Sequence, residues 1–129
     1  MLRGTPVGRA VEDGEVLAVG SGVRVIHTPG HTSGSVCYHL ERDGVLFTGD
    51  TVFSDGRAIS RSAPYPKSSR SDLRRSLSRL ASLDFDVLCG GHGTPLVGGA
   101  SDRLNELLAT QPEPSTWAGL LKRLLGFDP

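Results

Sequence analysis

Three side chains with metal-binding chemistry share one local setting in this sequence. His31, Asp50 and His92 each follow a short apolar run and stand beside a glycine. Imidazole and carboxylate groups are the usual protein ligands of zinc, iron and manganese. Glycine lets the backbone bend sharply and come close to a bound group. Taken as an ordered set, the three residues therefore indicate a metal site rather than three unrelated turns.

The elements that position these side chains are short strands ending at one edge of a sheet. Apolar runs at 23–26, 45–48 and 87–89 precede the three residues, and a Thr-Pro-Gly turn at 28–30 stops the first run. Proline ends a strand because it cannot donate to the hydrogen-bond ladder. The run at 45–48 is nearly all apolar, which predicts a strand buried on both faces.

The remaining segments predict a mixed sheet covered by helices. Alternation at 35–40 predicts a strand, and the leucine spacing from 73 to 80 predicts an amphipathic helix with Ser71 as its N-cap. Helical spacing recurs at 101–108. The stretch 53–71 is rich in Ser, Pro and Arg without any period, which predicts a long functional or mobile loop. We therefore expect an α+β fold with helices packed on one face of a mixed β-sheet.

Three ordered motifs resemble the second half of the metallo-β-lactamase-fold metallohydrolase superfamily and are similar to those of glyoxalase II. They are HTPGHTSGS at 27–35, LFTGD at 46–50 and GHG at 91–93. The resemblance implies half of an αββα sandwich at 1–110, followed by a C-terminal helical extension at 111–129.

The resemblance also implies ligand roles. His31 would bind one metal, His92 would bind the second, and Asp50 would bridge the two and orient the attacking hydroxide as the catalytic residue. No ligand role falls on His27. The expected cofactor is Zn²⁺ in a two-metal site, with iron as the alternative.

The chain departs from the family pattern in its first half. The family carries a His-x-His-x-Asp-His motif there, whereas the four histidines of this chain stand at 27, 31, 39 and 92. The chain therefore holds only part of a two-metal site. A half sandwich leaves one apolar sheet face open, which predicts association with the missing N-terminal half or with a second copy. The sequence leaves three origins of this chain open: a natural split subunit, a truncated relative, or a fragment of a longer protein.

The expected reaction is hydrolysis of an ester, thioester or lactone-type bond by hydroxide that the metal generates at neutral pH. The hydroxyls at 28, 32 and 35 are candidates for supporting the ligands. Arg57, Arg61 and Lys67 are candidates for binding an anionic part of a small-molecule substrate, and Tyr65 for a phenol near the reacting centre. A solvated basic surface is the alternative for this stretch. Two other functions stay open, a mono-iron sulfur dioxygenase-like enzyme and a non-catalytic remnant that binds a partner chain.

Charge and cysteine content restrict the partners and the compartment. In this chain of 129 residues, Lys plus Arg and Asp plus Glu both count 14. Zero net charge argues against nucleic acid or a membrane surface as partner. Residues 55–79, however, contain seven cations and two anions, so a nuclease function stays open as an alternative. Two cysteines are too few for a disulfide framework, and we see neither a signal peptide nor an apolar run of ~20 residues. We expect a cytoplasmic protein.

Overall fold

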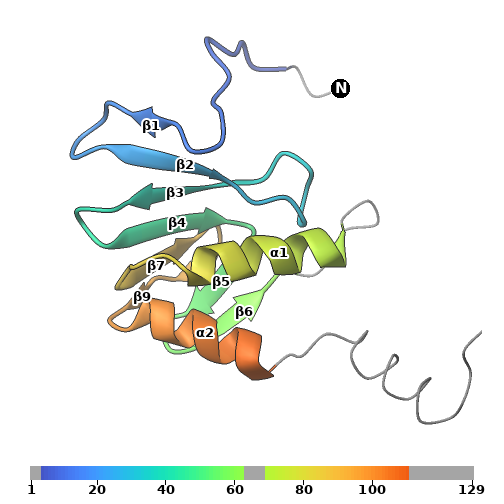
Figure 1. The fold of residues 1–129 in the computed structure, drawn as a ribbon, viewed down its shortest axis with the longest axis vertical. Coiled ribbons are helices and arrows are strands. Elements are labelled where there is room, and N and C mark those ends of the chain that lie inside the picture. The colour runs from blue at the N-terminus through green and yellow to red at the C-terminus, as the bar shows by residue number, and fades with distance from the viewer. Residues whose placement is uncertain (1–3, 63–68, 111–129) are drawn as a thin grey trace, which may run out of the picture.

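The computed structural model describes residues 4–62 and 69–110. In this part of the chain, α1 and α2 lie over one face of a six-stranded sheet whose strand order is β1-β2-β3-β4-β7-β9 (Figure 1). A smaller sheet has the order β6-β5-β8. The strands are β1 (Val16–Leu17), β2 (Val23–His27), β3 (Val36–Leu40), β4 (Val45–Gly49), β5 (Val52–Asp55), β6 (Ile59–Arg61), β7 (Val87–Gly90), β8 (Gly93–Thr94) and β9 (Leu96–Val97), and the helices are α1 (Arg70–Ala81) and α2 (Ala100–Thr110).

The larger sheet is mixed. Strands β1 to β4 are antiparallel neighbours, β4 pairs parallel with β7, and β7 pairs antiparallel with β9. The parallel pair arises because the chain leaves β4, passes through β5, β6 and α1, and returns beside β4 in the same direction. An α+β fold with a mixed sheet and helices on one face is therefore confirmed.

The core lies between the larger sheet and the two helices. Leu46 and Leu88 are paired on neighbouring strands and are fully buried. The leucine stripe predicted from 73 to 80 is buried against them, which confirms the amphipathic character of α1. The buried hydrophobic cluster consists of Ile26, Cys37, Leu46, Val52, Ile59, Leu73, Leu77, Leu80, Phe85, Leu88, Leu96, Ala100 and Leu104.

The opposite face of this sheet is apolar and only half covered. Because side chains alternate along a strand, the neighbours of the buried Cys37, Leu46 and Leu88 point away from the helices. Phe47 is 43% exposed, so the expectation of a strand at 45–48 buried on both faces is wrong for this chain. A second layer that would cover Phe47 is not among the residues described. We call this surface the open face; it comprises Val36, Tyr38, Leu40, Val45, Phe47, Val87 and Cys89.

Two local expectations are corrected. The stretch 53–71 is not a continuous loop, because it contains most of β5 and all of β6, which pair with each other. The two strands are held by backbone hydrogen bonds to each other. Such pairing does not require a hydrophobic period, so these strands left no sign in the sequence. The N-cap of α1 is Ser69, whose hydroxyl accepts from the Asp72 backbone N–H, and Ser71 lies inside the helix.

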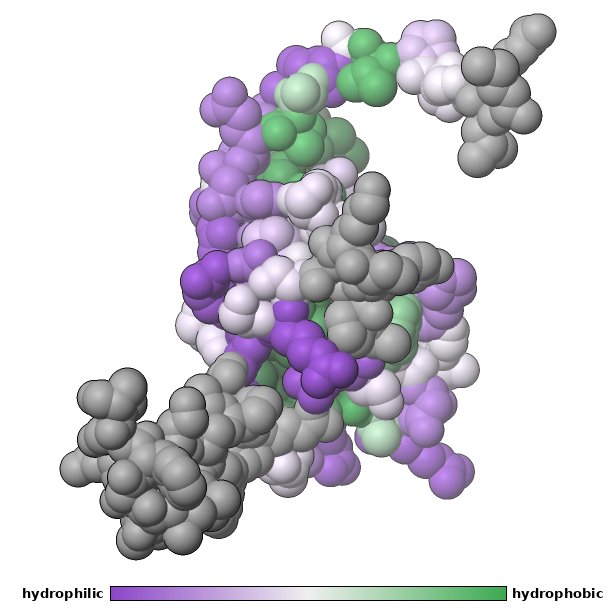
Figure 2. Space-filling model, turned by 90° about the vertical axis from the view of Figure 1, so that its right-hand side faces the viewer, coloured by the Kyte–Doolittle hydropathy of each residue, from purple (hydrophilic) through white to green (hydrophobic). Residues whose placement is uncertain are grey.

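The structure describes the N-terminal end of the chain from residue 4, whereas the described part of the C-terminal end stops at residue 110. The extension predicted at 111–129 lies outside the described residues. Figure 2 shows hydrophobic side chains at the surface in the upper part of the molecule, where the N-terminal segment lies, and Val7 and Val11 of this segment are exposed. Within the described ranges, neither helix combines the length and the apolarity needed to cross a membrane.

Candidate metal centre

The loop that carries His31 is held against α1. The Ser76 hydroxyl donates to the Pro29 carbonyl over 2.7 Å. Gly30 has φ +143°, and a Cβ built on it would lie 2.3 Å from the Leu73 Cα. The helix backbone therefore touches the loop at a point that only glycine can occupy. This contact fixes where the chain emerges toward His31.

The His31 ring has a polar neighbour at each nitrogen, and of these two contacts only the one at Nδ1 is within hydrogen-bond distance. Its Nδ1 lies 2.7 Å from the Ser62 Oγ, and its Nε2 lies 3.7 Å from the Asp50 Oδ2. The side chain is 15% exposed. The ring thus sits in the wall of the site with one nitrogen on a hydroxyl and the other facing the carboxylate.

Asp50 occupies the sharp turn after β4. Gly49 has φ +50°, and its carbonyl accepts a 2.6 Å hydrogen bond from the Gly91 N–H. A Cβ on Gly91 would come within 2.5 Å of the Asp50 Oδ1. Gly91 therefore leaves the space into which the carboxylate fits, and the turns after β4 and β7 are bonded to each other.

His92 approaches the other carboxylate oxygen. Its Nε2 lies 3.3 Å from the Asp50 Oδ1, and its side chain is 77% exposed. The Phe53 ring lies beside the imidazole with a centroid distance of 5.9 Å. His92 is thus the least enclosed of the three residues.

The three predicted ligands meet in space, with one histidine at each oxygen of Asp50. Two ligand atoms on one tetrahedral zinc lie about 3.3 Å apart, because each sits roughly 2.0–2.1 Å from the metal. The Asp50–His92 separation matches this value, and the Asp50–His31 separation is slightly longer. The nitrogen and oxygen donors therefore fit a divalent metal.

The ligand set is incomplete for any single metal. In residues 4–62 and 69–110, no three His, Cys, Asp or Glu side chains form a group that could hold one metal ion. A structural or catalytic zinc site takes three or four protein ligands. The described residues offer one histidine and one carboxylate oxygen to each position.

The other two histidines lie outside this cluster. The Nε2 of His27 lies 2.9 Å from the Ser33 carbonyl, which closes the loop that carries His31. His39 is buried on β3, where its Nε2 bonds to the Asp84 carbonyl. Both have local structural contacts within the described chain.

The hydroxyls predicted to support the ligands bond elsewhere. Thr28 contacts the Cys37 thiol and the Thr51 hydroxyl, each over 3.3 Å. Thr32 and Ser35 bond to each other across their turn. These contacts stabilise the loops rather than the ligand rings.

The hydroxyl that contacts the His31 ring belongs to Ser62, a residue that the sequence patterns did not single out. It lies 31 positions from His31, in a stretch without any visible period. The glycine that accommodates Asp50, Gly91, was visible in the sequence only as part of a glycine-rich turn.

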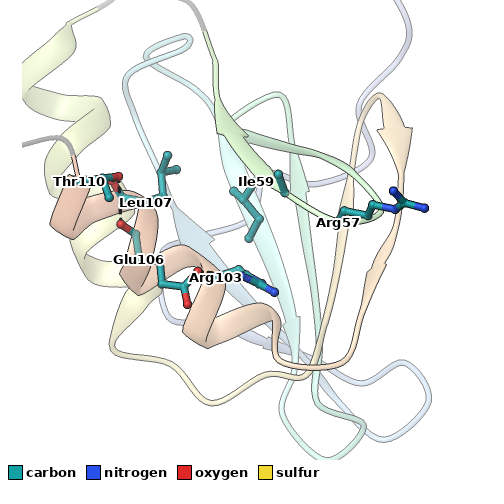
Figure 3. A pocket seen from close by; sticks show the side chains of 7 residues that line it. Arg57, Ile59, Arg103, Glu106, Leu107 and Thr110 are labelled. Carbon is teal, nitrogen blue, oxygen red and sulfur yellow. Dashed lines mark hydrogen bonds and ion pairs between the residues drawn. The ribbon is translucent and has the colours of Figure 1, made fainter.

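The residues predicted to bind substrate are spread over several places. Arg57 lines a shallow hollow of about 240 Å³ beside α2, which none of the three ligands lines. In Figure 3, the Arg57 side chain points away from Arg103 and Glu106. Arg61 is exposed at the end of β6. Tyr65 and Lys67 lie outside the described residues.

Curated relatives share the region that carries the three ligands. A hydroxyacylglutathione hydrolase from Maricaulis maris is 42% identical over 79 residues, which are 60% of this chain and 28% of that protein. The uncharacterized protein ML0493 from Mycobacterium leprae is 42% identical over 99 residues, 74% of this chain and 44% of that protein. The chain thus spans less than half the length of these relatives.

Solved structures agree with the sequence relatives. The metallo-beta-lactamase family protein TTHA1429 from Thermus thermophilus aligns with a TM-score of 0.61 and 34% identity, over 78% of this chain and 34% of that one. TTHA1623 in a di-iron-bound form aligns with a TM-score of 0.64 and 30% identity, over 81% of this chain and 50% of that one. The family model of the metallo-beta-lactamase superfamily matches residues 2–92. This chain therefore belongs to the metallo-beta-lactamase superfamily and corresponds to part of its domain.

Proposed function

We propose that this chain supplies the C-terminal half of the active site of a metal-dependent hydrolase. One observation carries the proposal: the Asp50 carboxylate has a histidine Nε2 at each of its two oxygens. A carboxylate used on both sides suits a two-metal site, in which it joins the two ions. Zinc is the metal we propose, and iron is the alternative because TTHA1623 was solved in a di-iron-bound form.

The chain's own residues would have distinct tasks. A bound metal supplies Lewis acidity at neutral pH. His31, which is largely enclosed, would hold one ion firmly, while the exposed His92 would hold the second at the solvent side. Asp50 would contribute a ligand oxygen to each of the two metal positions and orient the attacking oxygen.

The proposed substrate is a small molecule with an ester, thioester or lactone-type bond. The Maricaulis relative named hydroxyacylglutathione hydrolase supports this class. We propose Arg57, Arg61 and Lys67 as residues that bind an anionic part of the substrate, and Tyr65 as a substrate-binding phenol near the reacting centre. Arg61 has the best placement among those described, since it directly precedes Ser62, the contact of His31.

Arg61→Ala tests this binding role in an assembly that shows hydrolase activity. We expect KM for an anionic substrate to rise about two- to five-fold with little change in kcat, because one exposed charge contributes up to ~1 kcal/mol. Arg42→Ala is the matched control, since Arg42 is an exposed arginine on the β3–β4 turn. Equal KM values in wild type and Arg61→Ala would contradict the role.

The proposed partner covers the open face. It is either a chain that carries the missing N-terminal half or a second copy of this chain. The face is apolar and includes the exposed Phe47, and contiguous apolar surfaces of this kind mark association sites. We also propose a cytoplasmic location, because Cys37 and Cys89 are both free thiols.

Native mass spectrometry with metal analysis on the same sample tests the function and the assembly together. We expect an assembly larger than one chain that carries one or two zinc ions, or two iron ions, per site. A single iron ion per site without zinc would redirect the search to the mono-iron dioxygenase alternative. A monodisperse, metal-free monomer that stays inactive when a candidate first half is added would overturn the proposal in favour of a non-catalytic remnant.

A further inference from the structure

His31 is anchored through the nitrogen that faces away from Asp50. The Nδ1 of its ring lies 2.7 Å from the Ser62 Oγ, which is a short and well-formed hydrogen-bond distance. Ser62 is 2% exposed, so its hydroxyl is held inside the protein and does not exchange freely with solvent. Its position is therefore suited to determine the orientation of the ring.

Ser62 is itself tied to the turn that carries Asp50. Its backbone N–H donates to the carbonyl of Thr51 over 3.3 Å, and Thr51, which directly follows Asp50, is fully buried. Ser62 thus touches the His31 ring with its side chain and the Asp50 turn with its backbone. One residue relates the positions of two proposed ligands.

We propose that Ser62 is a positioning residue that holds the His31 imidazole with its Nε2 directed at Asp50; its importance for metal binding rests on the proposed function. A ligating Nε2 must be unprotonated, so the ring proton then resides on Nδ1. In that state the Nδ1–H donates to the Ser62 Oγ. A hydroxyl both donates and accepts, so Ser62 keeps the same contact with the ring before a metal arrives.

The proposal predicts a loss of metal affinity in Ser62→Ala. The alanine removes the Ser62 hydroxyl as an acceptor for the Nδ1–H in the ligating state, and it weakens the hold on the ring orientation toward Asp50. Removing the hydrogen-bond partner of a ligating histidine typically weakens metal binding 10- to 100-fold. We expect a decrease of about that size in a chelator-competition titration with Zn²⁺.

Ser60→Ala is the matched control. Ser60 lies on β6, two residues before Ser62, and it is exposed. We expect its Zn²⁺ affinity to equal that of the wild type. Thermal unfolding midpoints of both variants that lie within a few degrees of the wild-type midpoint would establish that the fold is retained.

A spectroscopic measurement without metal separates this inference from the proposed function. At about pH 8.5, where a typical imidazole is neutral, the ¹⁵N resonance of His31 Nδ1 should move in Ser62→Ala and stay in place in Ser60→Ala. An unmoved resonance in Ser62→Ala would overturn the inference, as would a moved resonance with unchanged Zn²⁺ affinity. If the wild type binds no metal, the proposed function fails, and a moved Nδ1 resonance still supports Ser62 as the residue that orients the ring.

Discussion

Replacing Asp50 by alanine should release metal from both positions at once. Each carboxylate oxygen faces a different histidine, so the substitution removes a ligand from each proposed metal position. Loss of an indirect partner already weakens binding 10- to 100-fold, and we expect the loss of this shared ligand to weaken it more than about 100-fold. Asp50→Asn should act in the same direction, because an amide keeps the shape and loses the charge.

The stoichiometry of bound metal makes this prediction specific. In an assembly that holds two ions per site, His92→Ala should lose one ion and Asp50→Ala should lose both, as counted by metal analysis and native mass spectrometry. His27→Gln is the control, because His27 contacts the Ser33 carbonyl instead of Asp50. A variant Asp50→Ala that retains the wild-type metal content would show that this carboxylate is not the bridge.

Replacing Gly30 by alanine should destabilise the fold by about 2–6 kcal/mol. The new Cβ would lie 2.3 Å from the Leu73 Cα, and the backbone at Gly30 has φ +143°. Overpacking of a well-packed site and a strained backbone conformation each contribute about 1–3 kcal/mol. The clash is with helix backbone, so no side-chain rotation relieves it.

Urea denaturation measures this effect directly. The free energy of unfolding of Gly30→Ala should fall by the stated amount, while Gly34→Ala should leave it nearly unchanged. Gly34 lies in the same loop, and a Cβ on it meets no atom within 4 Å. A wild-type midpoint for Gly30→Ala would mean that α1 does not hold this loop as the structure places it.

The sequence by itself determined the candidate ligands and most of the elements that carry them. His31, Asp50 and His92 stand after apolar runs, and the strands expected at those runs form as β2, β4 and β7. The leucine stripe of α1 faces the core as its period predicted. These features are local, because a period of two or of 3.6 is set by the backbone geometry of a single element.

Which strand face is buried was decided by the tertiary structure. On β3, alternation separated Cys37 and His39 from Val36 and Tyr38, and the helices cover the set that contains the histidine. The more apolar set belongs to the open face. The alternation within one strand cannot reveal which of its two faces is buried, because that depends on the layer that packs against each face. The layer that would cover the open face is not among the residues described.

The contacts that position the ligands were decided by the tertiary structure as well. Ser62 reaches His31 across 31 positions, and Ser76 reaches Pro29 across 47. The pairing of β5 with β6 and the docking of α1 create these contacts. Serine is so common on surfaces and in turns that its type carries no signal of such a role. Ligand identity could therefore be read from residue type and local setting, whereas the orientation of the ligands depends on packing between distant segments.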